Sequence, residues 1–492
     1  MRSRIIAPNR MAIETRVPQL GAQDMSSRYH YYEREIVIEA DPLVMATEVL
    51  RSAPQRSRLM YERAGVWGVA LGEAHKVVAT RTSVEVHQHG RWHAKSDGDP
   101  LVEVQKALAS LPVDGWRAYG TASFELAYLL YGLEGKNENE PLLHLTIPEV
   151  ELRLQQGAAL IRVLDQEQLD QTGRWLVQLD ERVKQAGSAN GRQVAHIACA
   201  LRNTADAEAY KALVVSATQA IASRKMHKVI ASRIVPVDTP VDLLETYAAG
   251  RRQNSPARSF VVCRDDIRLA GLSPETVLEV SADGCVTTQP LAGTRALESD
   301  EAENERLTAD LLSDPKELAE HAMSVKLAFE ELSRVCRRES VRVTDFMIVS
   351  RRGTVQHLAS RLAGMLAEGQ SSWTAFGALF PGVTASGIPK REALDWIQRN
   401  EAQQRGLYAG AVLTTDQDGT MDAALVLRSL FQRDAECWLR AGAGIVLQST
   451  PARELEETCE KLESIARYLI PRSTPEGSPA VARSLDSSVV EK

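Results

Sequence analysis

The chain has 492 residues, of which 44% are hydrophobic and 25% are charged, and its formal net charge is -7. This acidic balance argues against a general binder of nucleic acid or of anionic membranes, and the length is enough to bury a large core. Six scattered cysteines without a CxxC pair are typical of reduced thiols, and no apolar run is long enough to span a bilayer. The sequence therefore predicts a cytoplasmic protein of enzyme size.

The N-terminal part of the chain alternates short strands with helices. Residues 1–29 lack the long apolar core of a signal peptide, and we expect them to form a flexible extension. Residues 30–190 contain several strand-like runs with tight turns between them. Amphipathic spacing predicts helices over 100–111, 123–131 and 167–186.

A group of three histidines lies in the strand-rich stretch, with the spacing HxHxxxH. Alternation on a hairpin would place His87 and His89 on one face, with His93 nearby, which suggests a metal site. No carboxylate or cysteine completes such a site, so an exposed hairpin tip is the favoured interpretation.

A polar segment over 187–203 is the best candidate for a connection to the second half of the chain. A helix over 206–225 follows it, and then a strand with the sequence HKVIASRIVPV. Lys228 begins this strand beside apolar residues. It is either an ordinary lysine at a strand edge or a general base held in a closed pocket, and nothing local decides between the two.

Two strand-like segments are separated by Ser273-Pro274-Glu275. A carboxylate that follows a proline at a bend can point into a cleft, although a plain polar corner is the simpler interpretation. Further on, Gly293-Thr294 ends a strand with backbone that a ligand could approach closely.

Two helices carry Glu-x-x-Glu pairs far apart in the sequence. One helix, over 315–336, has Glu317 and Glu320, and the helix that begins at Pro451 has Glu454 and Glu457. On the second helix Lys461 shares the arc of the two acids, and a solvated charged face is the alternative interpretation of that arc. Together, four carboxylates without a thiolate predict a hard cation, and Mg²⁺ fits best.

Further candidates for anion binding follow in the chain. His357 lies among apolar residues in a predicted strand, where a satisfied core histidine is the more frequent case. A hairpin around 416–419 has a second strand that is apolar on both faces, so we expect Arg428 to be buried without an acidic partner on this hairpin. Tyr408 should lie on the facing strand within a residue or two of Arg428, and the pair would form a clamp for a carboxylate. The tail, 472–492, has the composition of a disordered segment.

The order of motifs over residues 206–470 resembles that of the chorismate-utilising enzymes, which include anthranilate, aminodeoxychorismate, isochorismate and salicylate synthases. The matching stretches are KVIASR, GLSPE, PLAGTRAL, DPKELAEHAMSV, VQHLAS, FPGVTASGIPK, RGLYAGAV, DAALVLRS, RAGAGIV and ELEETCEKL. The stretch FELAYLLYGL matches more loosely in the first half. The resemblance implies one large α/β (α+β) unit, with two antiparallel sheets packed together and helices outside.

The resemblance also implies roles for single residues. Lys228 would be the base that activates water for attack at ring carbon C2, and Glu275 the acid that protonates the departing C4 hydroxyl. Glu320 and Glu457 would hold Mg²⁺, supported by Glu317 and Glu454. The remaining residues would bind the substrate, chorismate: Gly293, Thr294, His357, Thr384, Tyr408, Arg428, Gly442 and Lys461.

A few positions indicate which member of the family this chain resembles most. Ala292 stands where aminodeoxychorismate synthases carry a lysine nucleophile, and Arg405-Gly406 stands where anthranilate synthases usually have Met-Gly. Lys390 is present, whereas enzymes that only make isochorismate tend to lack it. The motifs PLAGTRAL, TASGIPK and ETCEKL are most similar to those of salicylate synthases from siderophore pathways. This resemblance implies a monomer without a glutaminase subunit. An isochorismate synthase is the alternative, and a non-catalytic chorismate-binding protein is the hypothesis from another class.

Overall fold

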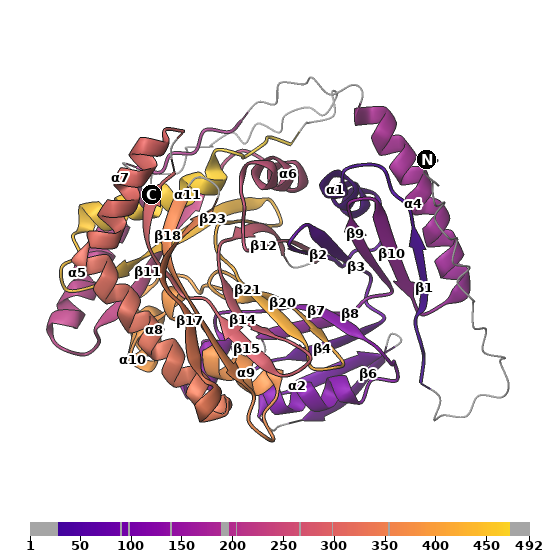
Figure 1. The fold of residues 1–492 in the computed structure, drawn as a ribbon, viewed down its shortest axis with the longest axis horizontal. Coiled ribbons are helices and arrows are strands. Elements are labelled where there is room, and N and C mark those ends of the chain that lie inside the picture. The colour runs from indigo at the N-terminus through magenta and orange to yellow at the C-terminus, as the bar shows by residue number, and fades with distance from the viewer. Residues whose placement is uncertain are drawn as a thin grey trace, which may run out of the picture.

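The structure is a computed structural model that describes residues 28–472, except 89–90, 97–98, 138–139, 188–195, 203, 265–266, 298 and 353–354. Two large sheets, in which neighbouring strands pair antiparallel, lie face to face with helices around them (Figure 1). This confirms the predicted fold class. The segments 1–27 and 473–492, which hold most of the predicted extension and tail, lie outside the described residues.

Within the described residues, the first sheet has eleven strands. Their order is β1 (Tyr32–Ile36), β10 (Ala158–Val163), β9 (Val150–Gln155), β3 (Val66–Leu71), β2 (Arg58–Arg63), β12 (Arg258–Cys263), β13 (Arg268–Ser273), β22 (Ser429–Arg433), β23 (Glu436–Ile445), β11 (Lys228–Pro236) and β19 (Gly387–Ile388). Strands from both halves of the chain therefore share one sheet.

The second sheet has twelve strands in the part of the chain that the structure describes. Their order is β16 (Leu291–Ala296), β18 (Val355–Met365), β15 (Cys285–Thr288), β14 (Thr276–Val280), β21 (Met421–Leu425), β20 (Ala411–Asp416), β7 (Arg117–Ala122), β8 (Leu143–Ile147), β4 (His75–Ala79), β5 (Val84–Gln88) and β6 (Arg91–Ser96), with β17 (Arg342–Arg352) paired to β18. Of the three histidines considered as metal ligands, His87 lies in β5 and His93 in β6, whereas His89 is outside the described residues.

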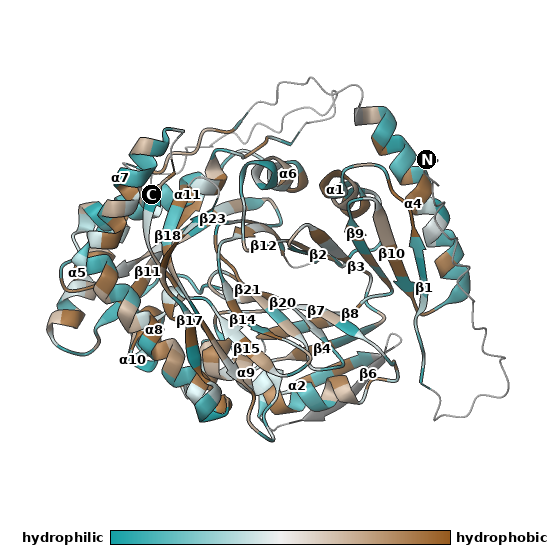
Figure 2. Cartoon of the chain, viewed as in Figure 1, coloured by the Kyte–Doolittle hydropathy of each residue, from teal (hydrophilic) through white to brown (hydrophobic). Residues whose placement is uncertain are grey.

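Helices pack against both sheets. They are α1 (Pro42–Ser52), α2 (Pro100–Ala109), α3 (Leu126–Leu130), α4 (Gln166–Gly187), α5 (Ala205–Ala222), α6 (Leu243–Gln253), α7 (Glu301–Ser313), α8 (Pro315–Val335), α9 (Ser372–Leu379), α10 (Lys390–Asn400) and α11 (Pro451–Ala466), with short 3₁₀ turns η1 (Arg338–Ser340) and η2 (Val383–Ala385). In the first sheet, α5 and α11 contact β11 and β23, and in the second, α7 and α8 contact β16 and β18. Figure 2 shows mixed hydrophilic and hydrophobic residues along α5, α7 and α8, as expected for amphipathic helices that cover a sheet. In the described part of the chain, no helix has the length and apolarity needed to cross a membrane.

Three helices begin with the same local chemistry, an aspartate followed by a proline. The Asp314 carboxylate accepts hydrogen bonds from the Lys316 and Glu317 amides at the start of α8, and Asp41 and Asp99 cap α1 and α2 in the same way. Proline suits the first helical position because its missing N–H would have no partner there. This cap sets the position of α8 along its axis, and with it the position of the first Glu-x-x-Glu pair.

Two of the places where the chain passes from one sheet to the other lie side by side. One is the turn between β13 and β14, which contains Glu275, and the other joins β21 to β22 and contains Arg428. The Leu425 amide donates to the Glu275 carbonyl oxygen at 3.1 Å, and the Leu272 amide donates to the Arg428 carbonyl oxygen at 3.2 Å. These backbone bonds hold the two crossings together.

Candidate active site

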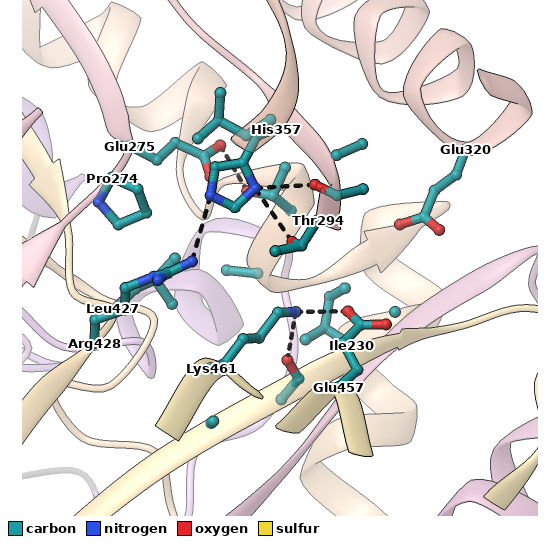
Figure 3. Close-up of a pocket in the computed structure, with 18 of the residues that line it drawn as sticks. Ile230, Pro274, Glu275, Thr294, Glu320, His357, Leu427, Arg428, Glu457 and Lys461 are labelled. Carbon is teal, nitrogen blue, oxygen red and sulfur yellow. Dashed lines mark hydrogen bonds and ion pairs between the residues drawn. The ribbon is translucent and has the colours of Figure 1, made fainter. Parts of the chain in front are cut away.

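A cavity opens where the two sheets meet at these crossings. It encloses about 810 Å³ of space that atoms do not fill, part of which is open to solvent. Twelve of the predicted site residues line it: Lys228, Glu275, Gly293, Thr294, Glu320, His357, Thr384, Tyr408, Arg428, Gly442, Glu457 and Lys461. Figure 3 shows Glu275, Thr294 and His357 together, with Lys461 and Glu457 across the cavity from them.

Lys228 lies in a closed pocket and not at an exposed strand edge. Its side chain is 1% exposed, and its Nζ is 2.7 Å from a carboxylate oxygen of Glu320 on α8. Gly444, on the neighbouring strand β23, leaves room for this pair, because an added Cβ there would lie 2.8 Å from the Glu320 carboxylate. The structure therefore excludes the surface interpretation of this lysine.

Glu275 is a carboxyl group suited to donating a proton. It is buried, and burial raises its pKa to about 8, although the hydroxyl of Thr384 donates to its Oε1 at 2.7 Å. A buried carboxyl without a close cationic partner takes up a proton because the charged form is poorly solvated there. Near neutral pH the acid is therefore protonated in the folded protein.

His357 holds one wall of the cavity. Its Nδ1 is 2.9 Å from the Gly293 carbonyl oxygen, and burial, followed by the charge of Arg428, lowers its pKa to about 3. The ring is therefore neutral, with Nδ1–H donating to Gly293 and Nε2 facing the Arg428 guanidinium at 3.4 Å. Gly293 has a φ of 59°, and a Cβ there would lie 3.0 Å from the Glu317 carboxylate, so this position requires glycine.

Arg428 presents a guanidinium without an acidic partner in the described part of the chain. The residue is half-buried, less than predicted, and burial lowers its pKa to about 10. Its φ of 48° is uncommon for a residue with a side chain, and such backbone is maintained where the surrounding structure requires it. A desolvated guanidinium facing a cavity is a binding group for an anion.

Tyr408 lines the same cavity, but it precedes β20 and does not lie within it. Hydrogen bonds between Ala409 and Val426 and between Val426 and Gly410 continue the β20–β21 ladder toward Tyr408, so the predicted proximity to the Arg428 region follows. The guanidinium carbons of Arg440 and Arg405 lie 5.3 Å and 5.8 Å from the centre of its ring.

Lys461 supplies a second cation at the cavity. Its Nζ donates to the Gly442 carbonyl oxygen at 2.9 Å and to Glu457 at 2.8 Å. Burial opposes the charge of Lys461, but Glu457 outweighs this and raises its pKa. The ammonium is therefore charged and fixed between α11 and β23.

The four acids predicted to hold a metal surround one end of the cavity. Glu320 and Glu457 line it, whereas Glu317 and Glu454 lie behind them and do not. Among the described residues, no three histidine, cysteine or carboxylate side chains are grouped closely enough to hold a metal ion as they stand. Glu320 and Glu457 are instead paired with lysines of the cavity, and Glu454 is 3.4 Å from Lys316.

The chemistry of these acids nevertheless fits a hard cation. Burial, together with the neighbouring Glu320 and Glu457 carboxylates, raises the pKa of Glu317 to about 7. Glu454 has a buried Oε2 without a hydrogen-bonding partner, and burial followed by Glu457 raises its pKa as well. Crowded carboxylates with an unsatisfied oxygen are the donor set that Mg²⁺ prefers.

Several residues at the site were not predicted from the sequence, and two of them lie beside its acids. Gly444 lines the cavity, and Lys316 pairs with Glu454; the i, i+4 spacing of Lys316 and Glu320 on one helix was the available signal. Lys390 is buried in a pair with Glu331 at 2.7 Å and does not line the cavity. Ala292, which stands where aminodeoxychorismate synthases carry a lysine nucleophile, does line the cavity.

The fold and this cavity define a class of protein. The family described as chorismate binding enzyme matches residues 56–467, and the chain belongs to this family. A salicylate synthase of Mycolicibacterium paratuberculosis is 37% identical over 457 residues, which cover 88% of this chain and 95% of that protein. The anthranilate synthase component 1 of Spirochaeta aurantia is 37% identical over 262 residues, which are 53% of this chain and 54% of that protein.

Solved structures agree with this assignment. Anthranilate synthase component I from Streptococcus pneumoniae superposes with a TM-score of 0.67 at 26% identity, covering 85% of this chain and 93% of that one. The menaquinone-specific isochorismate synthase from Escherichia coli also gives a TM-score of 0.67, at 22% identity, over 91% of this chain and 96% of that one. The second likeness concerns the fold alone.

Proposed function

We propose that this protein is a salicylate synthase, which converts chorismate to isochorismate and then to salicylate and pyruvate. The observation that carries the proposal is the convergence of a buried lysine, Lys228, and a buried protonated carboxyl group, Glu275, on one cavity. The similarity to a salicylate synthase over nearly the whole chain supports the choice of product.

In the first step Lys228, as the neutral amine, takes a proton from water, and the oxygen of this water attacks ring carbon C2 of chorismate. The two ring double bonds shift, the C4–O bond breaks, and Glu275 gives its proton to the departing hydroxyl, so that water leaves. The Thr384 hydroxyl orients Glu275 through its 2.7 Å hydrogen bond. Lys228 as the base and protonated Glu275 as the acid together fit an allylic displacement from opposite sides of a ring.

The binding groups hold the two carboxylates of the substrate. The Arg428 guanidinium, with Tyr408 beside it, receives the pyruvyl carboxylate, and His357 keeps the guanidinium in place from its neutral Nε2. When bound, Mg²⁺ would be held by Glu320 and Glu457, with Glu317 and Glu454 behind them, and would supply positive charge to the ring carboxylate. Lys461 contributes a further cation at that end.

In the second step the hydrogen on C2 of isochorismate passes to the methylene carbon of the enolpyruvyl group. The C3–O bond breaks, pyruvate leaves, and the ring becomes aromatic as salicylate. No further acid or base is needed, because holding the substrate at both ends places these atoms together. The same cavity can therefore serve both steps.

The protein acts, in this proposal, as a cytoplasmic monomer that takes chorismate alone, without a glutaminase subunit, nucleic acid or membrane. The test is to incubate the purified protein with chorismate and Mg²⁺ and to separate the products over time. We expect salicylate and pyruvate in equal amounts, with isochorismate as a transient. Isochorismate that accumulates without salicylate at any mildly acidic to mildly basic pH would support the alternative, an isochorismate synthase.

A further inference from the structure

Arg405 is a buried residue that the proposed mechanism does not use, yet its contacts reach the walls of the cavity. Its side chain is 1% exposed, and both its Nε and one terminal nitrogen bind the Glu401 carboxylate, at 2.9 Å and 2.7 Å. The remaining donors bind two carbonyl oxygens, those of Ala385 and Ile230, each at 2.7 Å. Arg405 itself does not line the cavity.

The two carbonyl groups belong to segments that carry the proposed acid–base pair. Ile230 lies on β11 two residues after Lys228, and both residues line the cavity. Ala385 follows Thr384, whose hydroxyl donates to Glu275. A single planar guanidinium therefore joins the strand of the base to the turn that orients the acid.

The segment that carries Arg405 is anchored from the other side as well. The Glu125 carboxylate accepts a hydrogen bond from the Arg405 amide at 2.8 Å, and the Arg405 guanidinium lies over the ring of Phe124 at 4.4 Å. Glu401 also accepts from the amide and the hydroxyl of Ser232 on β11, at 2.8 Å and 2.9 Å. These contacts leave the guanidinium a single orientation.

We propose that Arg405 is a positioning residue that fixes the strand bearing Lys228 relative to the turn bearing Thr384, and so sets the distance between the base and the acid across the cavity. The proposal rests on the acid–base roles of Lys228 and Glu275 given above. Lysine cannot replace this group, because one ammonium on a flexible chain cannot reach a carboxylate and two carbonyl oxygens in one plane.

The test is the variant Arg405→Lys, which keeps the charge beside Glu401 and removes the fork. We expect kcat for chorismate to fall by about 10²-fold with a smaller change in KM, since the hydrogen bonds of Arg405 go to neither Arg428 nor Lys461, the cations that bind the substrate. The hydrogen bond from Thr384 lowers the pKa of Glu275, so a displaced turn moves the alkaline limb of the pH–rate profile to higher pH. Lys228 and Lys461, the cations that face Glu275, are unchanged in this variant.

Arg162→Lys is the matched control. Arg162 is also a buried arginine that binds a carboxylate, Glu151, and a carbonyl oxygen, that of Gly115, but it lies on β10 away from the cavity. We expect it to lower the melting temperature without moving the pH limb or the kcat of the folded protein. A second variant, Glu401→Gln, weakens the hold on the guanidinium from the other side, although it also removes the carboxylate that pairs with Arg440 at 2.7 Å. It should shift the limb in the same direction.

Hydrogen exchange gives a measurement that does not depend on activity. The Ile230 amide donates to the Ser386 carbonyl oxygen beside the two acceptors of Arg405, so it should exchange faster in Arg405→Lys than in Arg162→Lys. Unchanged exchange and an unmoved limb in Arg405→Lys and Glu401→Gln would overturn the proposal. A wild-type protein that leaves chorismate unchanged would overturn the proposed function instead, and exchange would still decide whether Arg405 holds the turn.

Discussion

Two buried lysines in this protein make the same kind of contact in different settings. Lys228 pairs with Glu320 and Lys390 pairs with Glu331, each at 2.7 Å, but only Lys228 lines the cavity. Breaking either pair leaves a carboxylate buried without its counterion, so both substitutions should destabilise the fold. A difference in turnover rate between the Lys228 and Lys390 variants therefore reports the catalytic role of Lys228 and not a loss of stability.

We expect Lys228→Ala to reduce chorismate turnover by about 10²-fold or more, because a positioned base contributes that much to a proton transfer. Lys390→Ala should lose a comparable amount of stability but keep the turnover rate of its folded fraction. Steady-state rates, corrected for the folded fraction from circular dichroism, check this. A Lys228→Ala protein as active as Lys390→Ala would remove the base from the mechanism.

Glu275 predicts a pH dependence of stability that does not depend on activity. Burial raises its pKa from 4.5, the value of an unperturbed glutamate, to about 8, so the folded protein binds the proton more tightly than the unfolded chain does. Stability is then lost as pH rises from about 4.5 to about 8, where the unfolded chain releases the proton and the folded protein keeps it. Glu275→Gln lacks this loss. The melting temperature of the variant minus that of the wild type should therefore increase as pH rises through this window and stay constant at higher pH.

The control for this experiment is Glu305→Gln, at an exposed position on α7. Thermal melts at closely spaced pH values measure both variants against the wild type. A difference between Glu275→Gln and wild type that is the same at every pH would contradict the raised pKa.

At the scale of residues, the sequence predicts which side chains are functional better than it predicts how deeply they are buried or what they contact. Lys228 and Glu275 could be named, but whether the lysine was buried depended on Glu320 and Gly444, which lie far away in the chain. The apolar neighbours of Arg428 predict burial, yet it is half-buried because it lies in a crossing between sheets and not within a strand. Such differences arise from contacts that have no local signal.

At the scale of elements, α8 and α11 place their acids at one end of the cavity. The sequence predicts the start of each helix within a residue or so, because an Asp-Pro or Thr-Pro start and an apolar stripe are local features. That the two helices approach each other was a hypothesis from their Glu-x-x-Glu pairs, and the resemblance to a family implied it as well. The distance between them is set by the sheets that they cover.

We expect Mg²⁺ to be required for activity and to bind at these two helices. After metal has been stripped with EDTA, turnover should be lost and then restored by Mg²⁺, since crowded carboxylates repel one another without a cation. Glu320→Gln and Glu457→Gln should each weaken Mg²⁺ binding sharply in calorimetric titrations. Glu456→Gln is the matched control, because Glu456 is the neighbour of Glu457 on α11 but points outward to Arg202.

Two results would count against a metal at this place. One is full turnover of stripped protein in excess EDTA. The other is an equal loss of Mg²⁺ affinity in Glu456→Gln and Glu457→Gln, which would indicate a general effect of charge on α11.

At the scale of the whole molecule, the site forms where the chain crosses from one sheet to the other. Glu275 and Arg428 lie in two neighbouring crossings between the sheets, Lys228 and Gly442 come from one sheet, and His357 comes from the other. Periodicity predicts that a segment is a strand, but it does not give its neighbours, and partners such as β2 and β12 are far apart in the chain. The architecture could therefore be predicted only through the resemblance, whereas most individual elements could be predicted from the residues.

The proposed mechanism depends above all on the water molecule that Lys228 activates for attack at C2 of chorismate while Glu275 releases the C4 hydroxyl. The origin of the new hydroxyl oxygen is followed by running the reaction in water labelled with heavy oxygen and measuring the mass of the aromatic product. We expect salicylate that carries one heavy oxygen atom in its ring hydroxyl, because that oxygen comes from the attacking water. Salicylate formed without the label would mean that the hydroxyl came from the substrate, and would contradict the mechanism.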